Sequence, residues 1–220
     1  MKWLLGGLAA AALLVFGGPW VLFNVIESPA PPPLHLPAVG AAVVPGPVSG
    51  SWRVTTGSEA GYRVQEVLLG QHRAAVGRTS RVSGGIVVSG TTVTNAEFSV
   101  DMADVKSDQT SRDAQFRGYI METYKYRDAR FRLTQPIQLG SIPDVGTPVT
   151  VQATGDLTMR GVTRGVTFPL TAERAAGGID INAAIPITFS GWHIPNPTFA
   201  VAQVGDSGTL EVLLRLEPSS

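Results

Sequence analysis

The stretch closest to a catalytic motif is Gly205-Asp206-Ser207-Gly208, because the letters GDSG surround the nucleophilic serine in one class of serine proteases. A serine nucleophile also needs a histidine base within hydrogen-bond reach and an acid that orients this base. The folded part of the chain offers only His72 and His193, and glycines flank the motif just before a strand-like segment. We therefore interpret 205–208 as a turn and predict no catalytic residues and no enzyme activity.

Metal binding is the second chemistry to consider. Three scattered histidines are a poor ligand set for zinc or non-haem iron, and the chain has no cysteine for a disulfide or a thiolate site. No glycine-rich phosphate-binding motif precedes a helix. Four aspartates lie close together in the sequence: Asp101, Asp104, Asp108 and Asp113. Capping and solvation explain them, and calcium ligation is the alternative, although they lack the spacing of a dedicated loop. We expect no metal ion and no cofactor.

Apolar side chains are the remaining candidates for a functional site. A cavity lined by them would bind a hydrocarbon tail, since each methylene removed from water contributes ~0.8 kcal/mol. Core packing is the alternative for each of these residues. Arg112 and Arg117, near the expected barrel mouth, could meet an anionic head group. The predicted ligand-binding residues are Phe98, Val100, Phe116, Tyr119, Met121, Phe131, Leu157, Met159, Phe168, Ile185, Phe189 and Trp192.

Strands must position these side chains. Along Val149–Met159 the apolar or small residues fall on odd positions, and after Arg160-Gly161 they fall on even positions as far as Leu170. A period of two with a change of phase at a glycine predicts a β-hairpin with one buried face. The same alternation recurs in segments 96–102, 131–139, 179–189 and 210–216.

About eight long strands and a short one near Trp52, separated by short turns, predict an antiparallel meander. Closure into a barrel removes the free edges and the bare apolar face of a flat sheet. A barrel of eight strands is either just filled by its side chains or holds one small ligand. We predict an all-β fold, an eight-stranded antiparallel barrel with one short helix at 107–118 that Ser107 or Asp108 caps. A two-sheet sandwich is the alternative.

The N-terminal residues 1–26 differ from the rest. Lys2 is followed by no charged residue before Glu27, and a membrane-spanning helix needs ~20 apolar residues. We predict a signal anchor, a single-pass transmembrane helix with the folded domain on the extracytoplasmic side of the cell membrane. A cleaved signal peptide, with a loose cleavage site at 28–30, is the alternative and would give a secreted protein.

Residues 27–50 hold seven of the sixteen prolines and one charge, a composition that favours extended polyproline conformations. We expect a proline-rich linker that holds the domain, residues 51–220, off the membrane. Apart from Lys2 and Glu27, the chain carries 16 basic and 16 acidic residues, all within 51–220. This balance gives no electrostatic reason to expect a nucleic-acid partner.

Three stretches carry a resemblance to a known family. Residues 155–170 (GDLTMRGVTRGVTFPL) resemble the G-x-L-T-[IML]-[RH]-G-V-T-[RK]-x-V hairpin of the YceI-like, lipocalin-like proteins. Residues 100–118 (VDMADVKSDQTSRDAQFRG) resemble the strand-to-helix stretch of that family, and residues 192–216 resemble its closing loop and strand. Where many members have Phe-Phe and Tyr-Pro after the helix, this chain has Tyr119-Ile120-Met121 and Tyr126-Arg127.

The resemblance implies a lipocalin-like barrel that binds polyisoprenoids or other amphiphilic chains in an exported or envelope setting. We therefore expect storage, transport or sequestration of an isoprenoid or other hydrophobic lipid, without catalysis. The expected partners are this lipid and the membrane, and the sequence is compatible with a homodimer. The alternative function is an envelope scaffold whose filled barrel docks a protein partner through its loops.

Overall fold

The computed structural model describes residues 30–37, 46–68, 70–175, 177–198 and 202–219. The chain divides into two compact units, Met1–Pro31 and Pro32–Ser220. The predicted signal anchor, residues 1–26, lies outside the described residues. Within the described ranges, no helix is both long enough and apolar enough to span a bilayer.

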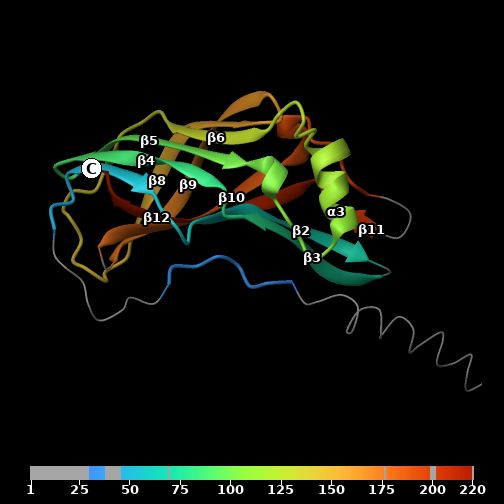
Figure 1. Ribbon diagram of the computed structural model, residues 1–220, viewed down its shortest axis with the longest axis horizontal. Coiled ribbons are helices and arrows are strands. Elements are labelled where there is room, and N and C mark those ends of the chain that lie inside the picture. The colour runs from blue at the N-terminus through green and yellow to red at the C-terminus, as the bar shows by residue number, and fades with distance from the viewer. Residues whose placement is uncertain (1–29, 38–45, 69, 176, 199–201, 220) are drawn as a thin grey trace, which may run out of the picture. The chain divides into compact units, whose positions relative to one another are not determined.

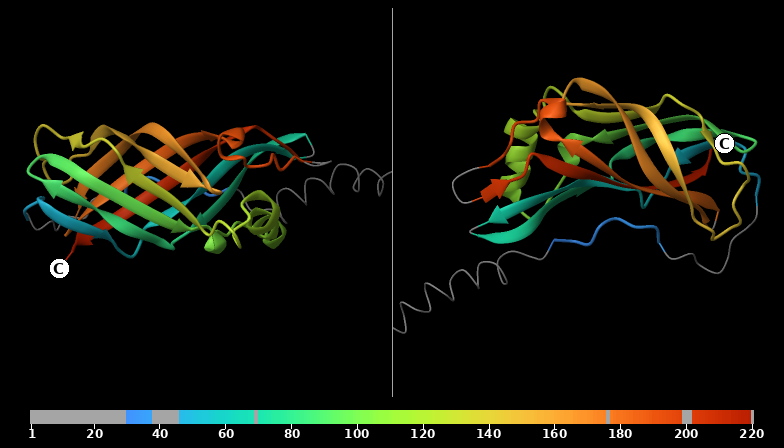
Figure 2. Two further views of the ribbon diagram at one scale, coloured as in Figure 1. Left: turned by 90° about the horizontal axis from the view of Figure 1, so that it is seen from above. Right: turned by 180° about the vertical axis from the view of Figure 1, so that it is seen from behind.

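Eight antiparallel strands close into a barrel (Figures 1 and 2). Each strand pairs with the next one around the barrel, and the last pairs with the first. The eight strands, in order around the barrel, are β1 (Gly50–Val54), β4 (Val82–Ser89), β5 (Thr92–Asp101), β6 (Asp128–Leu133), β8 (Val149–Met159), β9 (Val162–Ala175), β10 (Gly178–Thr188) and β12 (Ser207–Pro218). The predicted closed barrel is confirmed, and the sandwich alternative is wrong.

The hairpin of β8 and β9 is paired without a break from Met159 and Val162 at the turn to Val149 and Ala172 at the far end. The turn residues Arg160 and Gly161 have φ values of 48° and 74°. Positive φ at both turn residues gives the twist that a two-residue hairpin requires. The predicted change of phase at this turn keeps the apolar residues of both strands on the inner face.

A second hairpin, β2 (Glu59–Leu68) and β3 (Gln71–Thr79), extends the barrel wall. The first half of β12 pairs with β2, and its last residues pair with β1. Among the described residues, β3 pairs with β2 and, at one isolated bridge, Arg78 pairs with Lys106. The short strands β11 (Ala202–Val204) and β7 (Ile137–Gln138) pair with β2 and β5. The hairpin is therefore joined to the barrel mainly through β12.

The helical part is shorter than predicted. Helix α3 (Thr110–Gln115) continues into the π-helical turn η4 (Phe116–Ile120), at the end of the barrel near β2 and β3 (Figure 1). The predicted caps are wrong: Gln109 is the N-cap, and its side chain caps none of the described residues. Asp113 is buried and accepts hydrogen bonds from the Ser107 amide and hydroxyl, each at 2.7 Å. Ser107, which precedes the helix, therefore stabilises its first turn through these two hydrogen bonds to Asp113.

Two further short helical turns, η3 (Met102–Asp104) and η5 (Phe189–Trp192), flank the same end of the barrel. Of the described residues of the proline-rich linker, 32–37 and 46–50 belong to the barrel unit, which begins at Pro32. The chain enters β1 at Gly50, one residue before the predicted domain boundary.

Candidate functional site

The barrel encloses an apolar cavity of about 200 Å³. Alternating residues of each strand point inward, and several of them are alanines, including Ala96, Ala153 and Ala183, which are all buried. A methyl group in place of a longer side chain leaves the middle of the barrel unfilled. This eight-stranded barrel therefore belongs to the class with room inside, not to the class whose side chains fill the interior.

Most of the predicted ligand-binding residues lie on the cavity wall. They come from five neighbouring strands of the barrel, whose inner faces the alternation pattern had indicated. The seven predicted residues that line the cavity are Phe98, Val100, Phe131, Leu157, Met159, Phe168 and Ile185.

Two aromatic rings make one part of this wall. Phe131 on β6 and Phe168 on β9 meet edge to face, with ring centroids 5.3 Å apart and an interplanar angle of 67°. The Phe131 ring lies over Gly155, where an added Cβ would come within 2.5 Å of the ring. The glycine on β8 thus makes room for the aromatic pair, whose edge-to-face geometry is a preferred arrangement.

The other predicted residues lie elsewhere. Phe116, Met121, Phe189 and Trp192 are buried in a second apolar cluster at the helical end of the barrel, and they are not part of the cavity wall. The indole nitrogen of Trp192 donates to the carbonyl of Leu157 at 3.2 Å, so that η5 is tied to β8. Tyr119 is 66% exposed. The four buried side chains therefore close the helical end, and Tyr119 does not line the cavity.

Tyr62 on β2 lines the cavity, although it was not among the predicted residues. Its ring stacks on Phe116 at a centroid distance of 5.0 Å and lies over Gly77 of β3. Burial raises the pKa of the Tyr62 hydroxyl well above its ordinary value, an effect that Arg112 opposes and Asp113 reinforces. Tyr62 thus joins the cavity to the second cluster.

Aliphatic residues on the cavity wall were also missed as site residues. The alternation pattern assigns most of them to inner faces, but it does not distinguish residues that face a cavity from residues that fill the core. Loop residues had no periodic signal at all, and Val48, Ile142 and Pro143 line the cavity from such loops. The missed strand residues include Val82, Ile86, Val88, Val93, Leu133, Ile137, Val149, Val151, Leu170, Ile179, Ile181, Leu210, Val212 and Leu214.

Arginines stand at both ends of the barrel. Arg174 on β9, the cross-strand neighbour of Ile179 on β10, lines the cavity at the end away from the helical part. Its guanidinium donates to the carbonyls of Gly46 at 3.0 Å and Pro143 at 3.4 Å and so connects two loops. At the helical end, Arg112 pairs with Glu66 at 3.3 Å and with Asp108. Arg112, one of the two side chains expected to meet a head group, is therefore already neutralised.

The first half of the Gly205–Gly208 motif forms the predicted turn, and its second half belongs to a strand. Residues 205 and 206 connect β11 to β12, and Ser207 is the first residue of β12. The backbone carbonyl of Asp206 accepts a hydrogen bond from the Phe189 amide at 2.9 Å, and its carboxylate accepts one from Asn196 at 2.7 Å. Both groups of Asp206 hold the turn in place.

The described aspartates act locally. Asp101 caps η3 through the Ala103 amide at 3.0 Å and pairs with Arg127, and Asp104 pairs with Arg81. Within the ranges that the structure describes, no group of three histidine, cysteine or carboxylate side chains could hold a metal ion.

A closed antiparallel barrel with an apolar interior cavity places this chain among the small all-β cavity proteins. The family model of the YceI-like domain matches residues 52–216, which include all eight barrel strands except the first two residues of β1 and the last two of β12. The chain belongs to this family. No curated protein matches its sequence.

Solved structures share the fold. A polyisoprenoid binding domain from Saccharophagus degradans, implicated in plant cell wall breakdown, superposes with a TM-score of 0.62 and 17% sequence identity. The match covers 78% of this chain and 99% of that domain. BcnA of Burkholderia cenocepacia superposes with a TM-score of 0.53 and 18% identity, over 70% of this chain and 95% of that protein.

Proposed function

We propose that this protein binds an isoprenoid or other elongated amphiphilic lipid, with the apolar tail in the barrel cavity, and stores or transports it without chemical change. The observation that carries the proposal is the cavity of about 200 Å³ with an almost continuous apolar wall. Membership in the YceI-like family and the fold shared with a polyisoprenoid binding domain support the same class of ligand.

The size of the cavity limits how much of the ligand it holds. Pockets for drug-sized ligands typically measure ~300–1,000 Å³, and this cavity of about 200 Å³ is smaller. We therefore expect it to take one segment of a hydrocarbon tail, while the rest of the lipid extends beyond the wall. The cavity also argues against the alternative function, the scaffold with a filled barrel.

The proposed setting is the cell envelope. The uncharged segment from residue 3 to residue 26 supports a single membrane anchor with the barrel on the extracytoplasmic side. Fractionation of cells that express the full chain tests this part: an anchored protein stays with the membranes after a carbonate wash, and a cleaved one is released.

Direct ligand detection tests the binding. The barrel unit, residues 32–220, is purified without detergent, extracted with organic solvent and analysed by mass spectrometry; a prenyl alcohol is then titrated while tryptophan emission is followed. We expect a co-purifying lipid near one per chain, or saturable quenching through Trp52, which packs against the apolar core. A clean extract together with unchanged emission would refute lipid binding.

A further inference from the structure

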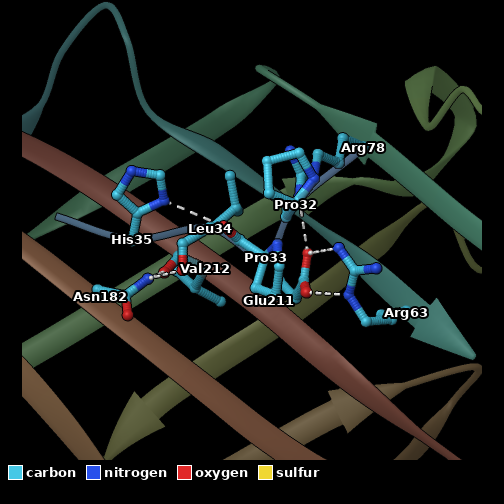
Figure 3. A network of polar contacts seen from close by, with 9 residues as sticks. All are labelled: Pro32, Pro33, Leu34, His35, Arg63, Arg78, Asn182, Glu211 and Val212. Carbon is cyan, nitrogen blue, oxygen red and sulfur yellow. Dashed lines mark hydrogen bonds and ion pairs between the residues drawn. The ribbon is translucent and has the colours of Figure 1, made fainter. Parts of the chain in front are cut away.

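Residues 32–37, which we call the strap, run along the outside of the barrel (Figure 1), and Pro32 to His35 lie over β12 (Figure 3). The Pro32 carbonyl accepts a hydrogen bond from the Arg78 guanidinium at 2.5 Å. The Leu34 carbonyl accepts one from the side-chain amide of Asn182 at 3.0 Å. The strap therefore contacts β3 through one donor and β10 through the other.

The two leucines of the strap add an apolar contact. Leu34 and Leu36 are partly buried, while Pro33 and His35 between them are exposed. This alternation is expected for an extended segment that rests one side on a surface. A proline-rich segment is already extended when free, so docking costs it little conformational entropy.

Beneath the strap lies a buried ionic triad. Glu211 on β12, whose side chain is 5% exposed, pairs with Arg63 on β2 at 2.5 Å and with Arg78 on β3 at 3.0 Å (Figure 3). Two guanidinium groups thus share one carboxylate. A buried cation is costly unless an acceptor meets it, and the Pro32 carbonyl of the strap supplies one.

The reach of Arg78 depends on a glycine. In the sheet, Glu211 lies opposite Gly61 on β2, and Gly61 lies opposite Arg78 on β3. A Cβ at Gly61 would lie 2.0 Å from the Gly77 carbonyl and 2.9 Å from the Arg78 Cα. Because Gly61 has no side chain, Arg78 spans β2 and contacts both the triad and the strap.

The hairpin that the strap contacts is also part of the cavity wall. Ala60, Gly61 and Tyr62 of β2 line the cavity from the inside, while Arg63 and Arg78 lie on the outside. Among the described residues, the free side of β3 pairs with the rest of the sheet at a single bridge, so β12, the triad and the contacts of Tyr62 and Glu66 with the helical part hold the hairpin. Loosening the outer contacts would therefore loosen the wall.

We propose that the strap is a latch on the β2–β3 hairpin. When it is docked, its carbonyls and leucines hold Arg78 and β10 in place and keep the cavity wall closed. When it is released, Arg78 loses an acceptor, the hairpin opens more often, and a lipid passes through the wall faster. The passage of lipid rests on the proposed function, whereas the restraint of the hairpin does not.

Two measurements on the full chain in lipid nanodiscs test the latch. The double variant Leu34→Ser/Leu36→Ser removes the apolar contact, and His35→Ala is the matched control, because the His35 ring nitrogen contacts only Pro33 of the strap itself among the described residues. We expect hydrogen exchange of the β2–β3 amides and transfer of a fluorescent prenyl probe to acceptor vesicles to rise about tenfold in the double variant. The control should match the wild type.

A second variant and the two separate readouts distinguish the outcomes. Asn182→Ala removes the donor to the Leu34 carbonyl and should change both rates in the same direction. Unchanged hydrogen exchange in both the double variant and Asn182→Ala would overturn the latch. If no form of the protein takes up the probe, the proposed function fails, and hydrogen exchange alone still decides whether the strap restrains the hairpin.

Discussion

The substitution Ala183→Leu fills the proposed site with the least disturbance elsewhere. Ala183 on β10 is buried and lines the cavity, so three added carbon atoms would occupy space that a ligand tail would otherwise fill. If each of these carbons displaces one methylene of the ligand, and each methylene contributes ~0.8 kcal/mol, binding weakens by about 2.4 kcal/mol. This loss corresponds to an affinity about 50-fold lower.

The neighbouring residue provides the control. Ala184 is exposed on the outer face of the same strand, so Ala184→Leu adds the same side chain to the outside of the barrel. We expect Ala184→Leu to bind a prenyl alcohol as the wild type does, in a titration followed by tryptophan emission. Urea unfolding of both variants should show that the free energy of unfolding has not fallen, because the added leucine at 183 enters existing space.

The two variants together test whether the ligand binds inside the barrel. Equal affinity of the wild type and Ala183→Leu, with both proteins folded, would mean that the ligand does not enter the cavity at this level. A loss of affinity in Ala184→Leu as large as that in Ala183→Leu would place binding on the outer surface instead.

Three further predictions concern stability and pH. Gly155→Ala places a Cβ 2.4 Å from the Arg132 carbonyl oxygen and 2.5 Å from the Phe131 ring, and it should lower the free energy of unfolding by about 1–3 kcal/mol in urea titrations; an unchanged free energy of unfolding would show that the strand and the ring shift to make room. Glu211→Gln leaves two guanidinium groups without their carboxylate and should cost about 3 kcal/mol in the same assay; a neutral effect would show that the triad is solvated. Because burial raises the pKa of Tyr62, the unfolded chain ionises first, and stability should fall as the pH rises above about 10. Tyr62→Phe should reduce this alkaline loss, and an identical pH profile in both proteins would contradict the assignment.

The sequence by itself determined most of the strands, although not β3, and also the hairpin at Arg160-Gly161 and the closure of the barrel. Alternation reports which face of a strand is apolar, and turn residues report where the chain reverses, because both depend on neighbouring residues. For the same reason, inner-face residues such as Phe98 and Phe168 could be named from the pattern and lie on the cavity wall. The family followed from the hairpin motif and is confirmed by the match over residues 52–216.

Only the tertiary structure decided which inner residues surround empty space and which fill it. Phe116 and Phe189 have the same apolar character as Phe168, yet both are buried in the second cluster and not on the cavity wall. The helical turns that fold over that end of the barrel bring them together. On the outer face, too, the sequence pattern does not show which residues are covered. Glu211 has the phase of a solvent-exposed residue but is buried, since Arg63, Arg78 and the distant residues 32–37 cover it. A local pattern specifies a face, whereas contacts between segments far apart in the chain determine what covers that face.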